Sequence, residues 1–515
     1  MSKNIVKLIT GVAGVVLLSR ILGFVREMII AHNFGTTADY DLYLIAVMLP
    51  ALAYGVINFS TVYLFVPFLS KKKAHDTGEI SWADIWPSFN LVVGSALLVA
   101  LLIIFGAPLI MKIWAADYSP ESFERIIWYA RLTSLMLIFG TTEAFMRAYL
   151  NVKKIFLYPA GGYIVYNLFS IFIILFFSAS LSTGAIVLGL LGGQVVQTLY
   201  LLLRVLKFDP FQSFRLKFIN VDTTAVLKAG LVIILIEIMN RSYFLIDRYV
   251  ALNFGEGVIS ALNYSQVLVQ LPESIVGFAI GAVMFPFFSD SATVRDDEKF
   301  GAIFYNTIIP ALMLSLPLAI FFYHNAADLV TLLFNRGKFD QNSVLITTAV
   351  LKPYVISVAA LFVINTSLRA IYSKGWLKQI LSMTIIVLVF KYVGNFILSD
   401  WFGYPGISLA TALSHLLFAL LMIGLILFKI KSKLKRQFVI DIVKLVVSGV
   451  AIWFVAFYPQ DYLLTLIGGR GKIDILLRLI VSGIFLLALY LLIIYLLGMS
   501  SHIKKALPGR STDER

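Results

Sequence analysis

Long apolar runs recur along almost the whole chain and are separated by short polar segments. A helix needs about 20 residues to cross a hydrocarbon core about 30 Å thick, and fourteen such runs can be placed along the sequence. We therefore predict an all-α polytopic membrane protein with about fourteen transmembrane helices. The predicted spans lie within residues 5–33, 41–69, 88–114, 125–150, 154–178, 183–206, 225–253, 258–288, 301–323, 343–372, 376–398, 403–428, 437–457 and 473–498.

Two similar blocks of sequence begin at the ends of the first and seventh predicted spans. Each block contains Asn-Phe-Gly, then Leu-Pro, then a Pro-Phe pair at nearly the same spacing, over residues 33–70 and 253–289. Both blocks follow an odd-numbered span, so the two halves would share one orientation and be related by an axis along the membrane normal. This repeat predicts two pseudo-symmetric six-helix bundles around a central cavity. We assign residues 1–220 to the N-terminal bundle, 221–430 to the C-terminal bundle, and 431–515 to two additional transmembrane helices and a cytoplasmic tail.

Lysine and arginine are concentrated in alternate loops between the predicted spans. The clusters at 71–73, 153–154 and 429–436 fall on one side, whereas the loop 115–124 on the other side is acidic. Cytoplasmic loops carry an excess of these residues, so we expect both termini in the cytoplasm. Four residues on the opposite side depart from this pattern: Arg336, Lys338, Arg470 and Lys472.

The composition supports a membrane protein and excludes several functions. The 515 residues are 60% hydrophobic and 14% charged, with a mean hydropathy of +0.91, far from the values of a soluble domain. The chain has no cysteine, which excludes a disulfide, a thiolate metal site and thiol catalysis. The net charge of +14 lies mainly in short loops, where it orients the protein and meets anionic headgroups. We therefore expect no nucleic-acid partner.

The first predicted span carries a polar stripe. Ser19, Arg20, Gly23, Arg26 and Glu27 occupy an arc of roughly 120° on a helix. Ionisable groups at bilayer depth cost at least about 2.5 kcal/mol each and usually face a bundle interior or water. Arginine keeps its charge, and its guanidinium group matches phosphate oxygens with paired donors. A diphosphate is therefore a natural ligand for Arg20 and Arg26.

The seventh predicted span repeats this pattern. Glu237, Asn240, Arg241, Asp247 and Arg248 again lie within roughly 120° of one helix face. Two charged stripes could therefore line one cavity.

The alternative for both stripes is neutralisation within a dry bundle. Arg26 could pair with Glu27 or Asp41, and Glu237 could pair with Arg241 one helical turn later. In the first span, two arginines share one carboxylate on the same stripe, which favours an external anion there.

A coupling-ion site is a separate hypothesis. Glu237, Asn240, Asn395 and Thr411 offer the oxygen ligands that suit Na⁺, and the carboxylate could instead carry H⁺. No resident metal or other cofactor is expected, so Na⁺ or H⁺ would serve only as a coupling ion. Three other pairs within spans are interpreted as ties between helices or groups near the membrane interface: Glu143 with Arg147, Asn365 with Arg369, and Lys391 with Asn395. His415 is interpreted as a hydrogen-bonded core residue.

Several segments resemble the MurJ/MviN family of lipid II flippases. The opening segment Ser19–Glu27, followed by Phe34-Gly35 and Asp41, is the most specific in combination with the later pieces. The similarity extends over roughly residues 8–428, and the last two spans match only in hydrophobicity and placement. The other similar segments are Ala148–Asn151, Pro159-Ala160 with Asn167, Leu333–Phe339 and Gly403–Ser414.

The resemblance implies a fold, a mechanism and a site. The fold is the fourteen-helix arrangement of the multidrug/oligosaccharidyl-lipid/polysaccharide exporter superfamily, which works by alternating access around a cationic cavity. The positions that match motifs linked with that cavity are Ser19, Arg20, Arg26, Asp41 and Asn167.

Two departures from the family pattern concern arginines. The family usually has an arginine shortly after the proline of the second span and an Asp-Arg pair in the eighth, where this chain reads Ala51–Gly55 and Tyr264–Leu268. We therefore add Arg241 and Arg248 to the substrate-binding candidates, because they could replace the missing cations from another direction.

The sequence is interpreted as a flippase of the bacterial cytoplasmic (inner) membrane. It would move an undecaprenyl-diphosphate-linked cell-wall precursor, lipid II in the first place, from the cytoplasmic to the outer leaflet. We expect it to act as a monomer, with the lipid-linked glycan and membrane lipids as partners. One alternative is a flippase for a lipid-linked exopolysaccharide or O-antigen unit. The other is a multidrug exporter of the same superfamily, which the surplus of arginine disfavours.

An enzyme is not expected. The segments between spans on the external side are short, with residues 326–342 among the longest. They hold no His/Glu metal spacing, no Ser/His/Asp set and no Gly-rich phosphate loop.

Overall fold

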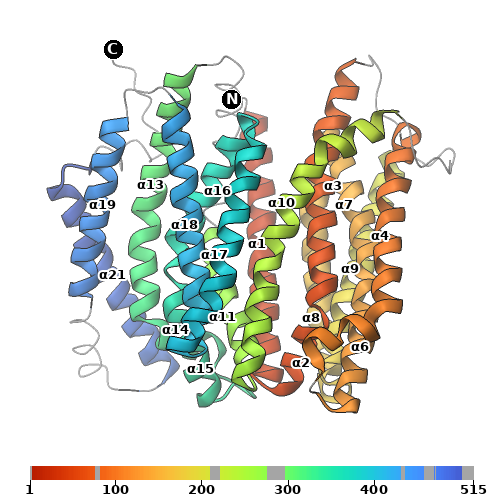
Figure 1. The fold of residues 1–515 in the computed structure, drawn as a ribbon, viewed down its shortest axis with the longest axis horizontal. Coiled ribbons are helices and arrows are strands. Elements are labelled where there is room, and N and C mark those ends of the chain that lie inside the picture. Colours follow the sequence, from red (N-terminus) through yellow and green to blue (C-terminus); the bar gives the residue numbers. More distant parts are fainter. Residues whose placement is uncertain are drawn as a thin grey trace. The chain divides into compact units, whose positions relative to one another are not determined.

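The computed structural model describes residues 3–75, 82–116, 118–208, 221–274, 296–430, 435–456, 469 and 471–500. Helices make up most of this part of the chain (Figure 1). The described residues contain one isolated β-bridge, between Arg336 and Phe339. The chain divides into two compact units, residues 1–260 with 336–340, and residues 261–335 with 341–515.

The first unit is formed by the N-terminal helices. In it α1 packs along α8, α8 along α9, and α3 along both α7 and α10. The stripe predicted on the first span therefore lies on a helix that contacts α8, and the second stripe lies on a helix that contacts α3. The elements are α1 (Lys3–Phe34), α2 (Ala38–Ala46), α3 (Met48–His75), α4 (Trp82–Ile110), α5 (Lys112–Ala115), α6 (Pro120–Ser134), α7 (Met136–Val152), α8 (Leu157–Leu181), α9 (Gly184–Phe208), α10 (Val221–Ala251) and the short η1 (Leu252–Phe254).

The second unit begins within α11 (Val258–Pro272). In this unit α17 packs along α18, α16 packs on α18 and α13, and α19 packs on α13. Its other elements are α13 (Asp297–His324), α14 (Ala326–Phe334), α15 (Gln341–Tyr354), α16 (Ser357–Ser373), α17 (Leu377–Phe402), α18 (Pro405–Lys429), α19 (Lys435–Val455) and α21 (Lys472–Leu496).

The all-α membrane fold is confirmed. Within the described residues, eight helices are long and apolar enough to cross a membrane, and two bent pairs raise that number to ten. Their outward faces are apolar, as Leu98, Leu102 and Phe105 show on α4, which suits contact with lipid. The count of fourteen spans, the orientation of the termini and the bundle boundaries at residues 220 and 430 stay predictions.

One of the bent pairs follows from a proline. α2 and α3 meet at Val47 with a bend of 43°. Pro50, in the first turn of α3, has no N–H group to continue the hydrogen-bond ladder of a preceding helix. The break leaves backbone carbonyls at the end of α2 available to other donors.

The two Asn-Phe-Gly copies both lie at the end of a helical element. The α-helix α1 ends at Phe34 and the 3-10 helix η1 ends at Phe254, and the glycine that follows has positive φ in each case, +56° at Gly35 and +85° at Gly255. Glycine adopts such φ values without the steric cost that other residues meet. The later part of the second repeat block, with Pro286, lies outside the described residues.

The segment 336–340 docks on the C-terminal end of α1. The Lys338 N–H donates to the His32 carbonyl at 2.8 Å. Gly337 has φ +59°, and a Cβ added there would lie 2.2 Å from the His32 carbonyl oxygen. Only glycine allows this approach. The similar segment Leu333–Phe339 therefore includes a turn that fixes the end of the helix carrying the arginine stripe.

Candidate functional site

The polar face of α1 packs against α8 through Asn167. The Asn167 side-chain amide donates to the Ser19 carbonyl at 3.2 Å and to the Tyr163 carbonyl at 2.9 Å. The Ser19 hydroxyl donates to the Val16 carbonyl at 2.7 Å and is buried. Gly23 faces the same amide, since a Cβ added there would be in ordinary van der Waals contact with Asn167 Oδ1, at 3.7 Å. The structure thus brings together Ser19 and Asn167, two of the predicted site residues.

Arg26 is held on three sides. One Nη donates to Asn167 Oδ1 at 3.0 Å and the other to Glu27 Oε1 at 2.9 Å. The guanidinium carbon lies 5.5 Å from the centre of the Tyr166 ring, within range of a cation–π interaction. The Nε–H is buried and has no acceptor among the described residues. A pair with Glu27, which neutralises the charge of Arg26 without an external anion, was the alternative to substrate binding. This pair is present in the structure.

Arg20 differs from Arg26. Its side chain is exposed, and it forms no hydrogen bond or ion pair with any residue that the structure describes. It lies within electrostatic range of Tyr163 on α8. Of the two arginines in the α1 stripe, one is compensated by a carboxylate and the other is available to an external anion.

The structure adds Arg147 on α7 to this neighbourhood. Its Nε donates to Glu143 Oε1 at 3.0 Å, and one Nη donates to Asn58 Oδ1 on α3 at 2.7 Å. Its guanidinium carbon is 5.8 Å from the ring centre of Tyr163. Tyr163 also lies within electrostatic range of Arg20. The sequence interpretation of Arg147 as a tie between helices is correct. Its contact with the Tyr163 ring on α8 was missed, because only the packed structure brings these two side chains together.

Arg241 on α10 lies over α3. Its Nε donates to Glu237 Oε1 at 2.7 Å, and its side chain is 43% exposed, against 8% for Glu237. A Cβ added to Gly55 would lie 2.8 Å from the Arg241 guanidinium carbon. The guanidinium therefore occupies space that a larger residue on α3 would take. This position is within the segment where an arginine of α3 was expected and is absent.

Arg248 contacts α2. Its Nη1 donates to the Leu44 carbonyl at 2.8 Å, in the last turn of α2 before the bend. It also lies 5.5 Å from the centre of the Phe244 ring. Arg248 therefore supplies a donor to the backbone at the bend between α2 and α3.

Asp41 contacts the first turn of α11. Its carboxylate accepts from the Gly257 N–H at 2.6 Å and from the Ser260 N–H at 2.8 Å, and also from the Ser260 hydroxyl. A carboxylate at a helix N-terminus satisfies free N–H groups and complements the helix dipole. Asp41 is 4% exposed, so its observed role is that of a helix cap.

The four residues of the coupling-ion hypothesis have different surroundings. Glu237 is bound to Arg241, and Asn240 is half-buried on the same helix. Asn395 and Thr411 are buried in the second unit, where Thr411 Oγ1 accepts from Lys391 Nζ. The described residues hold no group of three His, Cys, Asp or Glu side chains suited to a metal ion.

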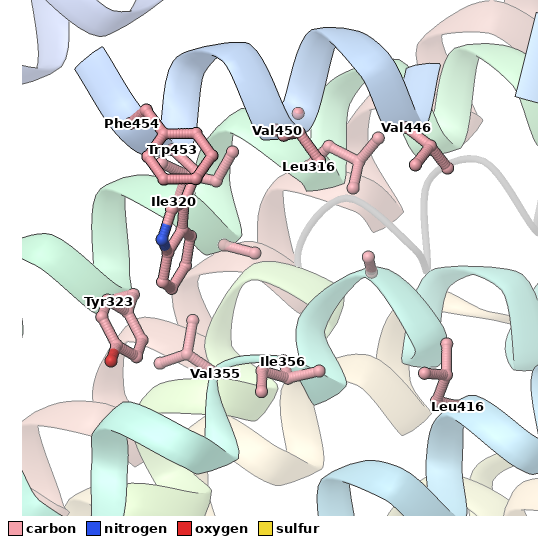
Figure 2. A pocket seen from close by; sticks show the side chains of 13 residues that line it. Leu316, Ile320, Tyr323, Val355, Ile356, Leu416, Val446, Val450, Trp453 and Phe454 are labelled. Atoms are coloured by element: carbon pink, nitrogen blue, oxygen red, sulfur yellow. The ribbon is translucent and has the colours of Figure 1, made fainter. Parts of the chain in front are cut away.

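An apolar pocket of about 510 Å³ lies within the second unit (Figure 2). Its walls come from α13, α18, α19 and the junction between α15 and α16. Figure 2 shows Trp453 and Phe454 of α19 on one side and Val355, Ile356 and Leu416 on the other. The lining is almost entirely carbon, so the pocket suits a hydrocarbon chain.

Comparison with known sequences shows that most of the chain matches one protein family. The family described as "Lipid II flippase MurJ" matches residues 30–467. A lipid II flippase MurJ of Burkholderia cenocepacia is 24% identical over 437 residues, covering 81% of this chain and 83% of that protein. A probable lipid II flippase MurJ of Buchnera aphidicola subsp. Schizaphis graminum is 25% identical over 517 residues, covering 97% and 99%.

Solved structures show the same fold. A lipid II flippase MurJ in an inward closed conformation matches with a TM-score of 0.75 at 19% identity, covering 94% of this chain and 97% of that one. A multidrug transporter of the MATE family matches in its inward-facing conformation with a TM-score of 0.66 at 15% identity, covering 81% and 98%. An outward-facing MATE transporter matches with a TM-score of 0.58 at 15% identity, covering 82% and 93%.

Proposed function

Because the chain belongs to the lipid II flippase MurJ family, we propose that it translocates an undecaprenyl-diphosphate-linked cell-wall precursor across the bacterial inner membrane. Lipid II is the first substrate to test, since the curated relatives carry that name. The protein would act as a transporter rather than an enzyme, as a monomer, and with no nucleic-acid partner.

The observation that carries this proposal is the state of the α1 arginines. Arg20 is exposed and unpaired within the described residues, and Arg26 has an uncommitted Nε–H. A diphosphate offers several oxygens to such donors. Arg20 would capture the diphosphate, and Arg26 would join by exchanging its bond to Glu27 for one to the substrate.

Release of the substrate follows from the same contacts. A ligand shifts a conformational equilibrium only by its differential affinity for the two states, so the diphosphate must bind more weakly in the outward state. Return of Glu27 to Arg26 would supply a competing anion at that stage. The outward and inward MATE structures with this fold support alternating access.

The polyprenyl tail of the substrate would stay in the lipid while the diphosphate is bound at α1.

A lipid-linked exopolysaccharide or O-antigen unit is the second candidate substrate. The chain lacks the arginine expected shortly after Pro50 and instead places Arg241 over Gly55. A diphosphate with a different glycan could be bound by this altered set of cations.

The test is mass spectrometry of lipids that co-purify with the full-length protein. Wild type should retain a diphosphate-linked lipid whose headgroup mass identifies the glycan, and Arg20→Ala with Arg26→Ala should lose it. Arg436→Ala, an exposed arginine on α19, is the matched control and should keep the lipid. An unchanged lipid profile in the double variant would contradict the role assigned to α1.

A further inference from the structure

Two side chains beside the α1 stripe keep free hydrogen-bonding groups. Arg20 on α1 is exposed and unpaired within the described residues. Tyr163 on α8 is 36% exposed, and its hydroxyl likewise forms no hydrogen bond with any residue that the structure describes. The two side chains lie within electrostatic range of each other. A cation and an aromatic ring with a free hydroxyl are therefore both available to one ligand.

The exposed part of Tyr163 does not belong to the lipid-facing side of α8. The apolar residues Leu168, Phe172 and Phe176 are exposed and form one stripe along this helix. At 100° per residue, Tyr163 lies on the side of α8 opposite the centre of that stripe. Its electrostatic neighbours are all polar or charged: Arg20, Glu143, Arg147 and Tyr166. The exposed part of the ring therefore faces polar groups rather than acyl chains.

The groups that surround Tyr163 on α7 and α8 are bound to one another. The Arg147 guanidinium carbon lies 5.8 Å from the centre of the Tyr163 ring, and Arg147 is itself bound to Glu143 and Asn58. The Tyr163 carbonyl accepts from the Asn167 amide at 2.9 Å. These contacts hold the ring in place before a ligand arrives, which lowers the entropic cost of binding. The network leaves the Tyr163 hydroxyl free.

A sugar attached to a diphosphate fits this pair of free groups. In a lipid-linked glycan, a single oxygen atom joins the first sugar to the diphosphate, so a residue that contacts this sugar must lie close to the cation that binds the phosphate. Tyr163 meets this condition with respect to Arg20. The C–H groups on the face of a pyranose ring pack on the electron-rich face of an aromatic ring. A sugar hydroxyl can also pair with the phenol, which donates and accepts hydrogen bonds.

We propose that Tyr163 is a specificity-determining residue, which stacks on the first sugar of the substrate while Arg20 binds the adjoining phosphate. The proposal rests on the proposed function and deepens it, because it requires a glycan next to the diphosphate. Undecaprenyl diphosphate is the carrier that is left when the glycan has been removed. Arg20 binds both forms, whereas Tyr163 favours the form that carries the glycan.

The test compares the binding of lipid II and of undecaprenyl diphosphate to the purified full-length protein. Tyr163→Leu should lower the affinity for lipid II by roughly five- to tenfold, through loss of one aromatic contact, and should leave that for undecaprenyl diphosphate within about twofold. Tyr163→Phe keeps the ring and should stay within about threefold of wild type for lipid II. Arg20→Ala should weaken the binding of both lipids. Tyr392→Leu, at an exposed tyrosine on α17, is the matched control and should change neither affinity.

Two results of this comparison would overturn the proposal. One is a Tyr163→Leu protein that binds lipid II as wild type does. The other is an equal loss of affinity for both lipids in a Tyr163→Leu protein that melts at the temperature of wild type, since the residue would then act on the diphosphate. If Tyr163→Leu fails to fold, photo-crosslinking decides.

Photo-crosslinking also separates this proposal from the assignment of lipid II. The photoreactive residue p-benzoylphenylalanine replaces Tyr163 in the full-length protein, which is irradiated in bacterial membranes. After acid cleavage of the diphosphate, the labelled α8 peptide should carry a sugar mass, and the same label in place of Tyr392 should carry none. If wild type binds neither test lipid but the label at position 163 captures another sugar, the substrate assignment is wrong and the role of Tyr163 stands. Capture of acyl chains alone, or of no lipid, would show that Tyr163 does not meet the glycan.

Discussion

The guanidinium group of Arg26 on α1 donates a 3.0 Å hydrogen bond to Asn167 Oδ1 on α8, 141 residues further along the chain. The same amide donates to the Ser19 carbonyl. One asparagine therefore orients the arginine and also holds α1 on α8. Because Glu27 pairs with Arg26 as well, the charge of Arg26 is positioned and compensated before any substrate arrives.

Replacing Asn167 by aspartate should weaken substrate binding. A carboxylate in place of Oδ1 would be a second anion on Arg26, and the diphosphate would have to displace it. Hydrogen bonds to charged groups contribute about 1.5–3 kcal/mol, so affinity for a diphosphate lipid should fall by roughly tenfold or more. Binding of lipid II to purified Asn167→Asp measures this, with Asn253→Asp as control. Unchanged affinity would show that Arg26 does not meet the diphosphate.

Replacing Glu27 by glutamine should act in the opposite direction. Without the carboxylate, Arg26 loses its compensating anion and should attract the diphosphate more strongly, by roughly tenfold. Turnover should fall, because release would lack the competing group. The same binding assay combined with a translocation assay separates the two effects. Glu124→Gln, at an exposed glutamate on α6, should change neither, and a Glu27→Gln protein with weaker binding would contradict the exchange mechanism.

Gly55→Ala tests whether Arg241 takes part in transport. The added methyl would lie 2.8 Å from the Arg241 guanidinium carbon, so the flexible end of Arg241 must move. Because a side-chain end can shift cheaply, the free energy of unfolding should change by less than about 0.5 kcal/mol, while translocation should fall. In an Arg241→Ala background the same substitution should have no further effect on transport. An additive loss in the double variant would place the role at Gly55 itself.

The sequence predicted those parts of the site that depend on one helix. The stripe from Ser19 to Glu27 follows from helical periodicity. The pair of Glu237 with Arg241, which was the neutralisation alternative for the second stripe, is present in the structure. Asn167 came from the family resemblance, and its bond to Arg26 gives that resemblance a physical basis.

Contacts between helices could not be predicted in the same way. Arg147 reaches Asn58 on α3, and Arg248 reaches a backbone carbonyl of α2, because packing and the bend at Val47 bring these groups together. Lys391 was interpreted as part of a tie between helices without a partner helix being named, and its bond to Thr411 on α18 is such a tie. Periodicity identifies the face on which a residue lies and leaves open which helix it meets.

Gly337→Ala should destabilise the protein more than Gly375→Ala. Both glycines have positive φ, +59° and +69°, but a Cβ at Gly337 would lie 2.2 Å from the His32 carbonyl oxygen, whereas one at Gly375 would meet nothing within 4 Å. The backbone strain common to both should cost about 1 kcal/mol. The clash at Gly337 adds to that, since a carbonyl of α1 cannot move aside as a side-chain end can, and the bond from Lys338 to His32 would be lost. Thermal unfolding of the two variants in detergent measures the difference. Equal shifts in melting temperature would mean that docking of residues 336–340 on α1 contributes nothing to stability.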